Sequence, residues 1–203
     1  MIQIAFLRHG VTAWNLQGRI QGRTDSRLSP RARRWLASRA LPAELTGWRV
    51  VVSPLRRARE TATLLGLSAP ELAPALLEMS WGQWEGCTLA ALRARHGAAF
   101  AAREAQGLDF RPPGGESPRL VQRRLQQWLR SLPASDPTEG VVAIAHKGVI
   151  RAALALASGW DMRGPPPLRI DWRCLQLFSA DALDRLTLVR GNLPLAVKAP
   201  PAL

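Results

Sequence analysis

The sequence predicts a three-layer α/β/α domain built on a mostly parallel central sheet. Three short apolar runs rich in β-favouring residues, 2–7, 48–52 and 141–145, are each followed by polar residues and then by a helical pattern. A chain of 203 residues can bury one sizeable core but is short for two ordinary domains. We therefore expect a single domain over residues 1–203, with a loosely ordered tail from about residue 194.

The first apolar run stops abruptly at a cation, an imidazole and a glycine, Arg8-His9-Gly10. In α/β proteins, the carboxyl edge of the parallel sheet is where ligands bind. On its own, however, this stretch is equally compatible with a polar strand end that leads into a turn. The residues that follow the other predicted strands are needed to distinguish these two interpretations.

Two helices are predicted from the same start signal, a serine cap followed by a proline whose missing N–H costs no hydrogen bond in the first turn. Ser29 and Pro30 open the first helix, which is expected to reach about residue 40. Ser53 and Pro54 are expected to open the second, which ends at Gly66.

Two adjacent arginines lie in the first turn of the second helix. Arg56 has Glu60 one helical turn later, so a solvated ion pair explains it. Arg57 has no acidic residue at that spacing, and it lies close to the end of the preceding strand. Arg57 is therefore the better candidate for binding a ligand.

The second half of the chain continues the alternation of helices and strands. Its last buried run, 141–145, delivers His146 before an apolar helix. The other predicted elements are a tryptophan-rich loop (76–86), a helix broken near Gly97 (88–106), an amphipathic helix after the turn at 111–118, and two late strands (175–178 and 186–189).

The formal net charge of +13 comes almost wholly from arginine, because Lys147 and Lys198 are the only lysines. Such a charge favours anionic partners, either a phosphorylated small molecule or nucleic acid. The chain contains no recognised RNA- or DNA-binding motif, which argues against nucleic acid. Four arginines of one predicted helix are expected to form a solvated face: Arg119, Arg123, Arg124 and Arg130.

Two cysteines, Cys87 and Cys174, lie far apart and outside any paired motif, which disfavours a disulfide framework and a zinc site. The first apolar run is short and is followed at once by Arg8, unlike a signal peptide. No uncharged stretch approaches the roughly 20 apolar residues that span a bilayer. We expect a cytoplasmic protein without a membrane partner. The sequence leaves the oligomeric state open, a homodimer included.

The ends of the three buried strands carry the groups of one candidate site. If the strands are parallel neighbours, Arg8-His9, His146, and Ser53 with Arg57 just beyond it converge at one edge of the sheet. Two imidazoles and two guanidiniums around one point suit a tetrahedral dianion such as phosphate, whose oxygens arginine binds in a bidentate manner.

Three other chemistries fit the residues less well. Two histidines without a convergent carboxylate or thiolate are a thin set of metal ligands, and the flanking arginines repel a dication. A Walker-type phosphate loop is absent. Ser53 lacks the Gly-x-Ser-x-Gly elbow of a serine nucleophile. A histidine therefore remains as the group that attacks phosphorus.

Five segments in this order resemble motifs of the histidine phosphatase superfamily, whose members share the phosphoglycerate mutase-like fold: 7–15, 53–62, 77–86, 114–117 and 145–151. The resemblance covers roughly residues 2–155. It implies that His9 is the nucleophile, that Glu78 is the general acid and base, and that Arg8, Arg57 and His146 bind the phosphoryl oxygens. It implies no metal and no other cofactor.

The resemblance also assigns secondary phosphate or substrate contacts. They fall on the loop over the phosphate (Asn15, Gln21, Gly22 and Thr24) and on the rim (Glu116 and Ser117). Glu85 is expected to be structural, and His96 to be a surface histidine. Lys147 departs from the family pattern, because it stands where a glycine is usual, and Ala32 and Trp35 differ from the usual residues of the first helix in a way that is expected to affect packing. Lys147 adds bulk and charge beside the pocket and leaves the substrate preference open.

The implied activity is that of a metal-independent phosphomonoesterase. It is a histidine acid phosphatase-like phosphoric monoester hydrolase that acts on a small phosphorylated metabolite through a phosphohistidine. A 2,3-bisphosphoglycerate-dependent phosphoglycerate mutase is the first alternative, but the chain has little room for the extra segments of such an enzyme. The second alternative is a non-catalytic basic binding domain on the same fold, which would have no need of both His9 and Glu78.

Overall fold

The computed structural model describes residues 1–132, 140–181 and 185–198, and at its centre is a six-stranded sheet in the order β4-β3-β5-β1-β6-β7. The first four of these strands are parallel, and β6 and β7 run antiparallel to their neighbours. The predicted fold class is therefore confirmed. The strands are β1 (Ile2–Arg8), β3 (Arg49–Val52), β4 (Glu71–Leu72), β5 (Gly140–Ala145), β6 (Leu175–Ala180) and β7 (Leu186–Leu193).

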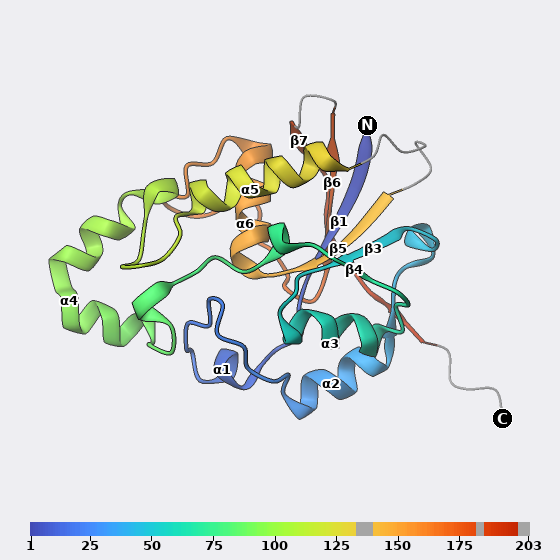
Figure 1. Ribbon diagram of the computed structural model, residues 1–203, viewed down its shortest axis with the longest axis horizontal. Helices are drawn as coiled ribbons and strands as arrows, with labels where there is room; N and C mark the ends of the chain where they lie inside the picture. Colours follow the sequence, from blue (N-terminus) through green and yellow to red (C-terminus); the bar gives the residue numbers. More distant parts are fainter. Residues whose placement is uncertain (133–139, 182–184, 199–203) are drawn as a thin grey trace.

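Helices cover both faces of the sheet (Figure 1). Helices α2 (Pro30–Ala37) and α3 (Arg56–Leu65) lie on one face, and α5 (Pro118–Ser131) and α6 (Lys147–Ser158) lie on the other. Helix α4 (Leu89–Glu104) extends away from the sheet and is kinked at Gly97, as the sequence predicts. The short helix α1 (Ala13–Leu16) follows β1. None of the helices in the described ranges is long and apolar enough to cross a membrane.

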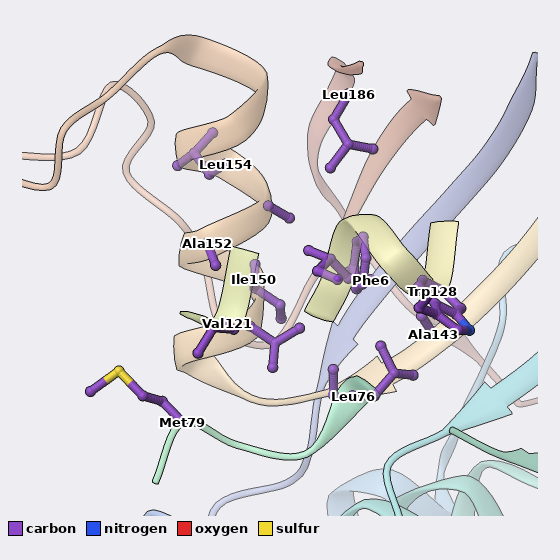
Figure 2. Packing of buried hydrophobic residues seen from close by; sticks show 14 of the residues in the cluster. Phe6, Leu76, Met79, Val121, Trp128, Ala143, Ile150, Ala152, Leu154 and Leu186 are labelled. Atoms are coloured by element: carbon purple, nitrogen blue, oxygen red, sulfur yellow. The ribbon is translucent and has the colours of Figure 1, made fainter. Parts of the chain in front are cut away.

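Alternate residues of β1 supply two hydrophobic clusters, one on each face of the sheet. Ile4 and Phe6 belong to the cluster that includes residues of α5 and α6, whereas Ala5 and Leu7 belong to the cluster under α2 and α3. All four are essentially inaccessible to solvent. Figure 2 shows Phe6 and Trp128 in the first cluster. Their rings pack edge to face, with 6.4 Å between the ring centroids. Strand β1 is thus held rigidly from both sides, which fixes the residue that follows it.

The three buried strands of the sequence analysis are adjacent and end together. In the register of the sheet, Arg8 pairs with Ala145, and Val52 pairs with Ile144. The backbone continues this alignment, since the amide of His9 donates to Ala145 O and that of Ser53 to Ile144 O, both at 3.0 Å. The expected convergence of the three strand ends at one edge is confirmed.

Helix α3 begins later than expected, at Arg56 rather than at Pro54. Its cap comes from the loop after β1, where the Asp25 carboxylate accepts hydrogen bonds from the amides of Arg56 and Arg57. The Glu60 carboxylate forms its ion pair with Arg33 of α2, not with Arg56. The prediction that Gly66 ends the helix is confirmed by its left-handed conformation, with φ of 79°.

The tail differs in part from its expected disorder. Strand β8 (Ala196–Val197) pairs antiparallel with β2 (Arg39–Ala40), and the preceding Leu195 is buried. Residues 194–198 are therefore attached to the body of the fold through a second, two-stranded sheet. The rest of the predicted tail, 199–203, lies outside the described residues.

Candidate active site

His9 lies directly after β1, and its side chain is buried. Its Nδ1 is 2.7 Å from the carbonyl oxygen of Gly10. Because a carbonyl can only accept a hydrogen bond, Nδ1 carries the proton and Nε2 keeps a free lone pair. Burial, and then the charges of Arg8 and Arg57, hold the pKa of His9 well below the ordinary histidine value. The ring is therefore neutral, and the lone pair of Nε2 is available for a nucleophilic attack.

His146 follows β5 and is fully buried, with its ring centroid 5.1 Å from that of His9. Its Nε2 lies 2.7 Å from Ser53 Oγ, and this contact fixes the orientation of the ring. Its pKa is also held well below the ordinary value, first by burial and then by the nearby His9, Arg57 and Arg8. The serine that the sequence analysis assigned to a helix cap is thus the partner of the second histidine.

Arg57 is fully buried in the first turn of α3. Its two terminal nitrogens donate to the loop after β1, Nη1 to Thr24 O at 2.9 Å and Nη2 to Gly22 O at 2.7 Å. Nη1 also pairs with Asp25 at 3.2 Å. Arg8 has a different support, because its Cζ lies 5.5 Å from the centre of the Trp172 ring. Burial lowers the pKa of both guanidiniums, but arginine remains charged in proteins.

Three nitrogen atoms around His9 have no hydrogen-bond partner. Among the described residues, buried side-chain nitrogens of this kind occur only at Arg8 Nε, Arg57 Nε and His146 Nδ1. An unsatisfied buried donor costs about 1–3 kcal/mol, and more when the group is charged. Three of them beside one neutral imidazole are accounted for by a ligand that brings several acceptor oxygens and negative charge, as a phosphoryl group does.

Glu78 lies on the segment that follows the 3₁₀ turn Pro74–Leu76, and it contacts the first turn of α6. Its carboxylate accepts hydrogen bonds from the amides of Met79 at 2.8 Å and Gly148 at 3.0 Å. A Cβ at Gly148 would come within 2.4 Å of Glu78 Oε1, so a larger residue there would displace the carboxylate from its present position. Met79 packs beside the same turn, and Figure 2 shows it at the border of the hydrophobic cluster. The carboxylate is thereby fixed in position.

Arg124 and Glu116 hold the segment that carries Glu78. Arg124 of α5 donates to the carbonyl of Ala75 and, at 2.7 Å, to that of Leu77. Glu116 pairs with Arg124 at 3.3 Å, and it accepts a hydrogen bond from the Ser80 amide at 2.9 Å. The expectation that Arg124 belongs to a solvated face is wrong, because Arg124 exposes only 17% of its side chain.

Glu85 holds the loop over the site rather than the site itself. Its carboxylate accepts hydrogen bonds from the Thr24 hydroxyl and from the amides of Arg23, Thr24 and Trp81. Burial opposes the ionisation of Glu85, but these hydrogen bonds keep its pKa below the ordinary value. Gly22 lies so close that a Cβ would be 2.0 Å from Glu85 Oε1. These contacts agree with a structural role for Glu85.

A cavity of about 640 Å³ opens at the site, a volume typical of pockets for small ligands. Most of the residues assigned from the sequence line it: Arg8, His9, Asn15, Gln21, Gly22, Arg57 and Glu78. His146 is buried and is not part of this lining, but its ring lies next to that of His9.

Three predicted contact residues fall outside the cavity lining and are used differently. Thr24 binds Glu85 through its hydroxyl. Glu116 connects Arg124 to the Ser80 amide and also pairs with Arg23 at 3.1 Å. Ser117 caps α5, where its side chain accepts a hydrogen bond from the Leu120 amide. The lining also contains residues that the sequence analysis did not assign to the site, among them Lys147, Arg151 and Trp172.

The lowered pKa values of His9 and His146 predict a definite pH behaviour. Both imidazoles should stay neutral in the ligand-free protein at pH 6.5. Below that pH the unfolded chain binds protons that the folded one does not, so the free energy of unfolding should fall as the pH drops. Histidine C2–H shifts in an NMR titration, together with urea unfolding at pH 7.5 and 5.5, measure both effects. Titration of these two rings with midpoints near 6.5 would contradict the assignment.

Metal coordination finds no support in the arrangement of side chains. In the described part of the chain, no group of three or more His, Cys, Asp and Glu residues is placed to hold a metal ion. The two histidines of the site are instead surrounded by guanidiniums, which favour an anion. The arrangement can therefore bind a phosphoryl group, offer it a neutral imidazole nitrogen, and supply a carboxyl group on the same cavity wall.

Comparison with known proteins points in the same direction. The model of the histidine phosphatase superfamily (branch 1) matches residues 4–192. A glucosyl-3-phosphoglycerate phosphatase of Mycobacterium tuberculosis is 36% identical over 169 residues, which make up 75% of this chain and 74% of the relative. A 6-phosphofructo-2-kinase/fructose-2,6-bisphosphatase of Gallus gallus is 34% identical over 73% of this chain, but the match covers only 31% of that longer protein.

Solved structures extend the similarity to nearly the whole chain. The mycobacterial glucosyl-3-phosphoglycerate phosphatase in complex with VO3 superposes with a TM-score of 0.76 at 28% identity, covering 95% of this chain and 100% of the other. A protein of Thermus thermophilus superposes with a TM-score of 0.67 at 32% identity, again over 95% of this chain and 100% of the other.

Proposed function

The chain belongs to the histidine phosphatase superfamily, and we propose that it hydrolyses the phosphate ester of a small metabolite through a covalent intermediate on His9. Membership confirms the resemblance that the five sequence motifs indicated. Together with its phosphatase relatives, it identifies the protein as a phosphoric monoester hydrolase. The observation that carries the proposed mechanism is the set of three unpartnered buried nitrogens around the neutral ring of His9.

In the first step, Nε2 of His9 attacks phosphorus in line with the scissile bond. The N–P bond forms as the P–O bond breaks, and the leaving oxygen takes a proton from Glu78. In the second step, water attacks the phosphohistidine while Glu78 removes its proton. The N–P bond breaks, inorganic phosphate leaves, and His9 returns to its neutral state with Nδ1 still bound to Gly10 O.

Two guanidiniums and one neutral imidazole N–H stabilise charge on the phosphoryl oxygens as it redistributes in the transition state. Arg8 and Arg57 each contribute an unpartnered Nε, and His146 contributes Nδ1, which can donate when Nε2 accepts a hydrogen bond from the Ser53 hydroxyl. The donors are fixed before substrate binds, since Arg57 is held by three acceptors and His146 by Ser53. Such preorganised donors need little rearrangement during the reaction.

The substrate class follows from the cavity and from the relatives. A cavity of about 640 Å³ exceeds what a phosphate alone requires and suits a metabolite of modest size. One relative is a glucosyl-3-phosphoglycerate phosphatase, and the match to the Gallus gallus protein is to a 6-phosphofructo-2-kinase/fructose-2,6-bisphosphatase. We favour hydrolysis over phosphoglycerate mutase activity on these grounds. From the sequence we also infer that the enzyme acts in the cytoplasm, and we leave open whether it forms a homodimer.

Release of inorganic phosphate tests the proposed function. We expect the purified enzyme to release phosphate steadily from nitrophenyl phosphate and from glycerol 3-phosphate, with unchanged rates in excess chelator because no step uses a metal. The same assay with 3-phosphoglycerate separates hydrolysis from isomerisation. Conversion to 2-phosphoglycerate that requires 2,3-bisphosphoglycerate, with negligible free phosphate, would replace the phosphatase by a mutase. Absence of any turnover would favour a binding domain.

A further inference from the structure

The cavity has a second cationic group, on α6, that the phosphoryl chemistry does not use. Lys147 immediately follows His146, and Arg151 comes one helical turn later on the same face of α6. Both side chains line the cavity together with His9 and Glu78. Like charges at this spacing weaken an isolated helix by about 0.2–0.5 kcal/mol. The two cations therefore lower the stability of the helix slightly, and the stability of the fold does not explain why they are neighbours.

Neither cation is neutralised by a carboxylate. Within the described ranges, no ion pair involves Lys147 or Arg151. The two carboxylates of the cavity lining have other partners, since Glu78 accepts from the amides of Met79 and Gly148, and Glu104 pairs with Arg93 at 2.7 Å. Burial, and then the charges of Arg151 and Arg8, lower the pKa of Lys147, and the nearby Glu78 carboxylate offsets only part of this effect. An anion beside it would relieve this repulsion.

Aromatic rings hold both cations in place. The Lys147 Nζ lies 5.7 Å from the centre of the Trp172 ring, and the Arg151 Cζ lies 4.8 Å from that of Trp160. The Trp172 ring also contacts Arg8, so Lys147 and the phosphoryl-binding Arg8 lie against the same ring. A cation over an aromatic face is oriented without being neutralised, and it keeps its donors for a ligand.

We propose that Lys147 and Arg151 form a subsite for a second anionic group of the substrate, a carboxylate or a further phosphate, beside the phosphoryl group that His9 attacks. This inference rests on the proposed function and narrows its substrate class to metabolites with two anionic groups. Lys147 is then a specificity-determining residue.

Matched substrates test this subsite. In 3-phosphoglycerate a carboxylate replaces the hydroxymethyl group of glycerol 3-phosphate, while the primary phosphate ester stays the same. Fructose 1,6-bisphosphate and fructose 6-phosphate form a second pair. We expect the unaltered enzyme to have the higher kcat/KM for the doubly anionic member of at least one pair. Lys147→Met keeps the length that packs on Trp172, and it should lower that ratio about tenfold, the loss expected for a charge-assisted hydrogen bond of ~1.5 kcal/mol.

Three further variants make the result decisive. Arg151→Met should lower the same ratio, Lys147→Arg should largely restore it, and Arg95→Met, which removes a charge from the exposed face of α4, should leave it unchanged. If Lys147→Met and the unaltered enzyme have the same ratio of kcat/KM between doubly and singly anionic substrates for both pairs, the subsite is wrong. The proposed phosphatase activity would be unaffected by that result. Failure of the unaltered enzyme to hydrolyse nitrophenyl phosphate and glycerol 3-phosphate would overturn the proposed function, and the subsite with it.

Discussion

Arg57→Ala should lower kcat/KM by about a thousandfold or more, because a transition-state arginine contributes on the order of 10³–10⁵ in phosphoryl transfer. Arg57 lines the cavity, is fully buried, and keeps its Nε unpartnered. The adjacent Arg56 is exposed, and its contact with Asp25 uses the backbone amide, which alanine retains. Arg56→Ala should therefore change kcat/KM by less than about threefold. Steady-state kinetics with nitrophenyl phosphate compare the two.

Arg57 also supports the loop after β1 through the carbonyls of Gly22 and Thr24, so loss of folding has to be separated from loss of catalysis. Arg57→Lys keeps the charge but cannot reproduce the three hydrogen bonds and the free Nε, so its thermal unfolding temperature should fall. Its kcat/KM should stay severely reduced even well below that temperature, where circular dichroism shows the variant to be folded. Comparable losses in the Arg56 and Arg57 variants would show that the assignment of the two arginines is wrong.

Glu78→Gln should separate substrates by their leaving groups. An alkoxide leaves poorly without a proton, so the variant should hydrolyse glycerol 3-phosphate about 10²–10⁴ times more slowly, the range of general acid catalysis. Nitrophenolate leaves without help, and its ester should be affected far less in the phosphorylation step. Single-turnover rates isolate that step from hydrolysis of the intermediate. Glutamine fits the same space beside Gly148, so the fold should be preserved.

Glu85→Gln is the matched control for the second carboxylate. Glu85 binds the Thr24 hydroxyl and three backbone amides, and no residue of the chemistry depends on it for a proton. The variant should slow both substrates by a similar factor, because the loop over the site loses its anchor. If the rate of Glu85→Gln depended on the leaving group and that of Glu78→Gln did not, Glu85 would be the general acid and Glu78 the structural residue.

The architecture could be predicted because its signals are local. Three apolar runs, each followed by polar residues and a helical pattern, identify β1, β3 and β5 as buried parallel strands. A short run of this kind must lie inside the sheet, and parallel neighbours must end at one edge. The positions of His9 and His146 follow from that alone. The argument that singled out Arg57 was weaker, because Glu60 pairs with Arg33 instead of Arg56, and Arg57 itself pairs with Asp25.

The contacts that could not be predicted join residues far apart in the chain. The cap of α3 is Asp25, which precedes Arg56 by 31 residues, so the nearer Ser53 was assigned to the wrong role. The segment of Glu78 is held by Arg124, which lies 47 residues after Leu77. Sequence periodicity places Arg124 on a helix, but it does not show which carbonyl groups that helix face meets.

The rim residues show the same limit. Short polar residues near a binding loop serve equally well as ligand contacts or as caps and anchors, and the sequence does not distinguish these uses. Ser117 precedes a proline and caps α5, while Thr24 satisfies Glu85. Lys147 could be recognised as unusual from the motif, but only the fold places Arg151 and Trp172 beside it.

The central claim is that a phosphoryl group is attached to Nε2 of His9 during turnover. A phosphohistidine is labile in acid and stable in base, so a reaction with ³²P-labelled substrate that is quenched in alkali should leave label on the protein, and peptide mapping should find it at His9. Acid treatment should release the label, and His9→Ala should never acquire it. Label that persists in His9→Ala, or that maps to His146, would contradict the account.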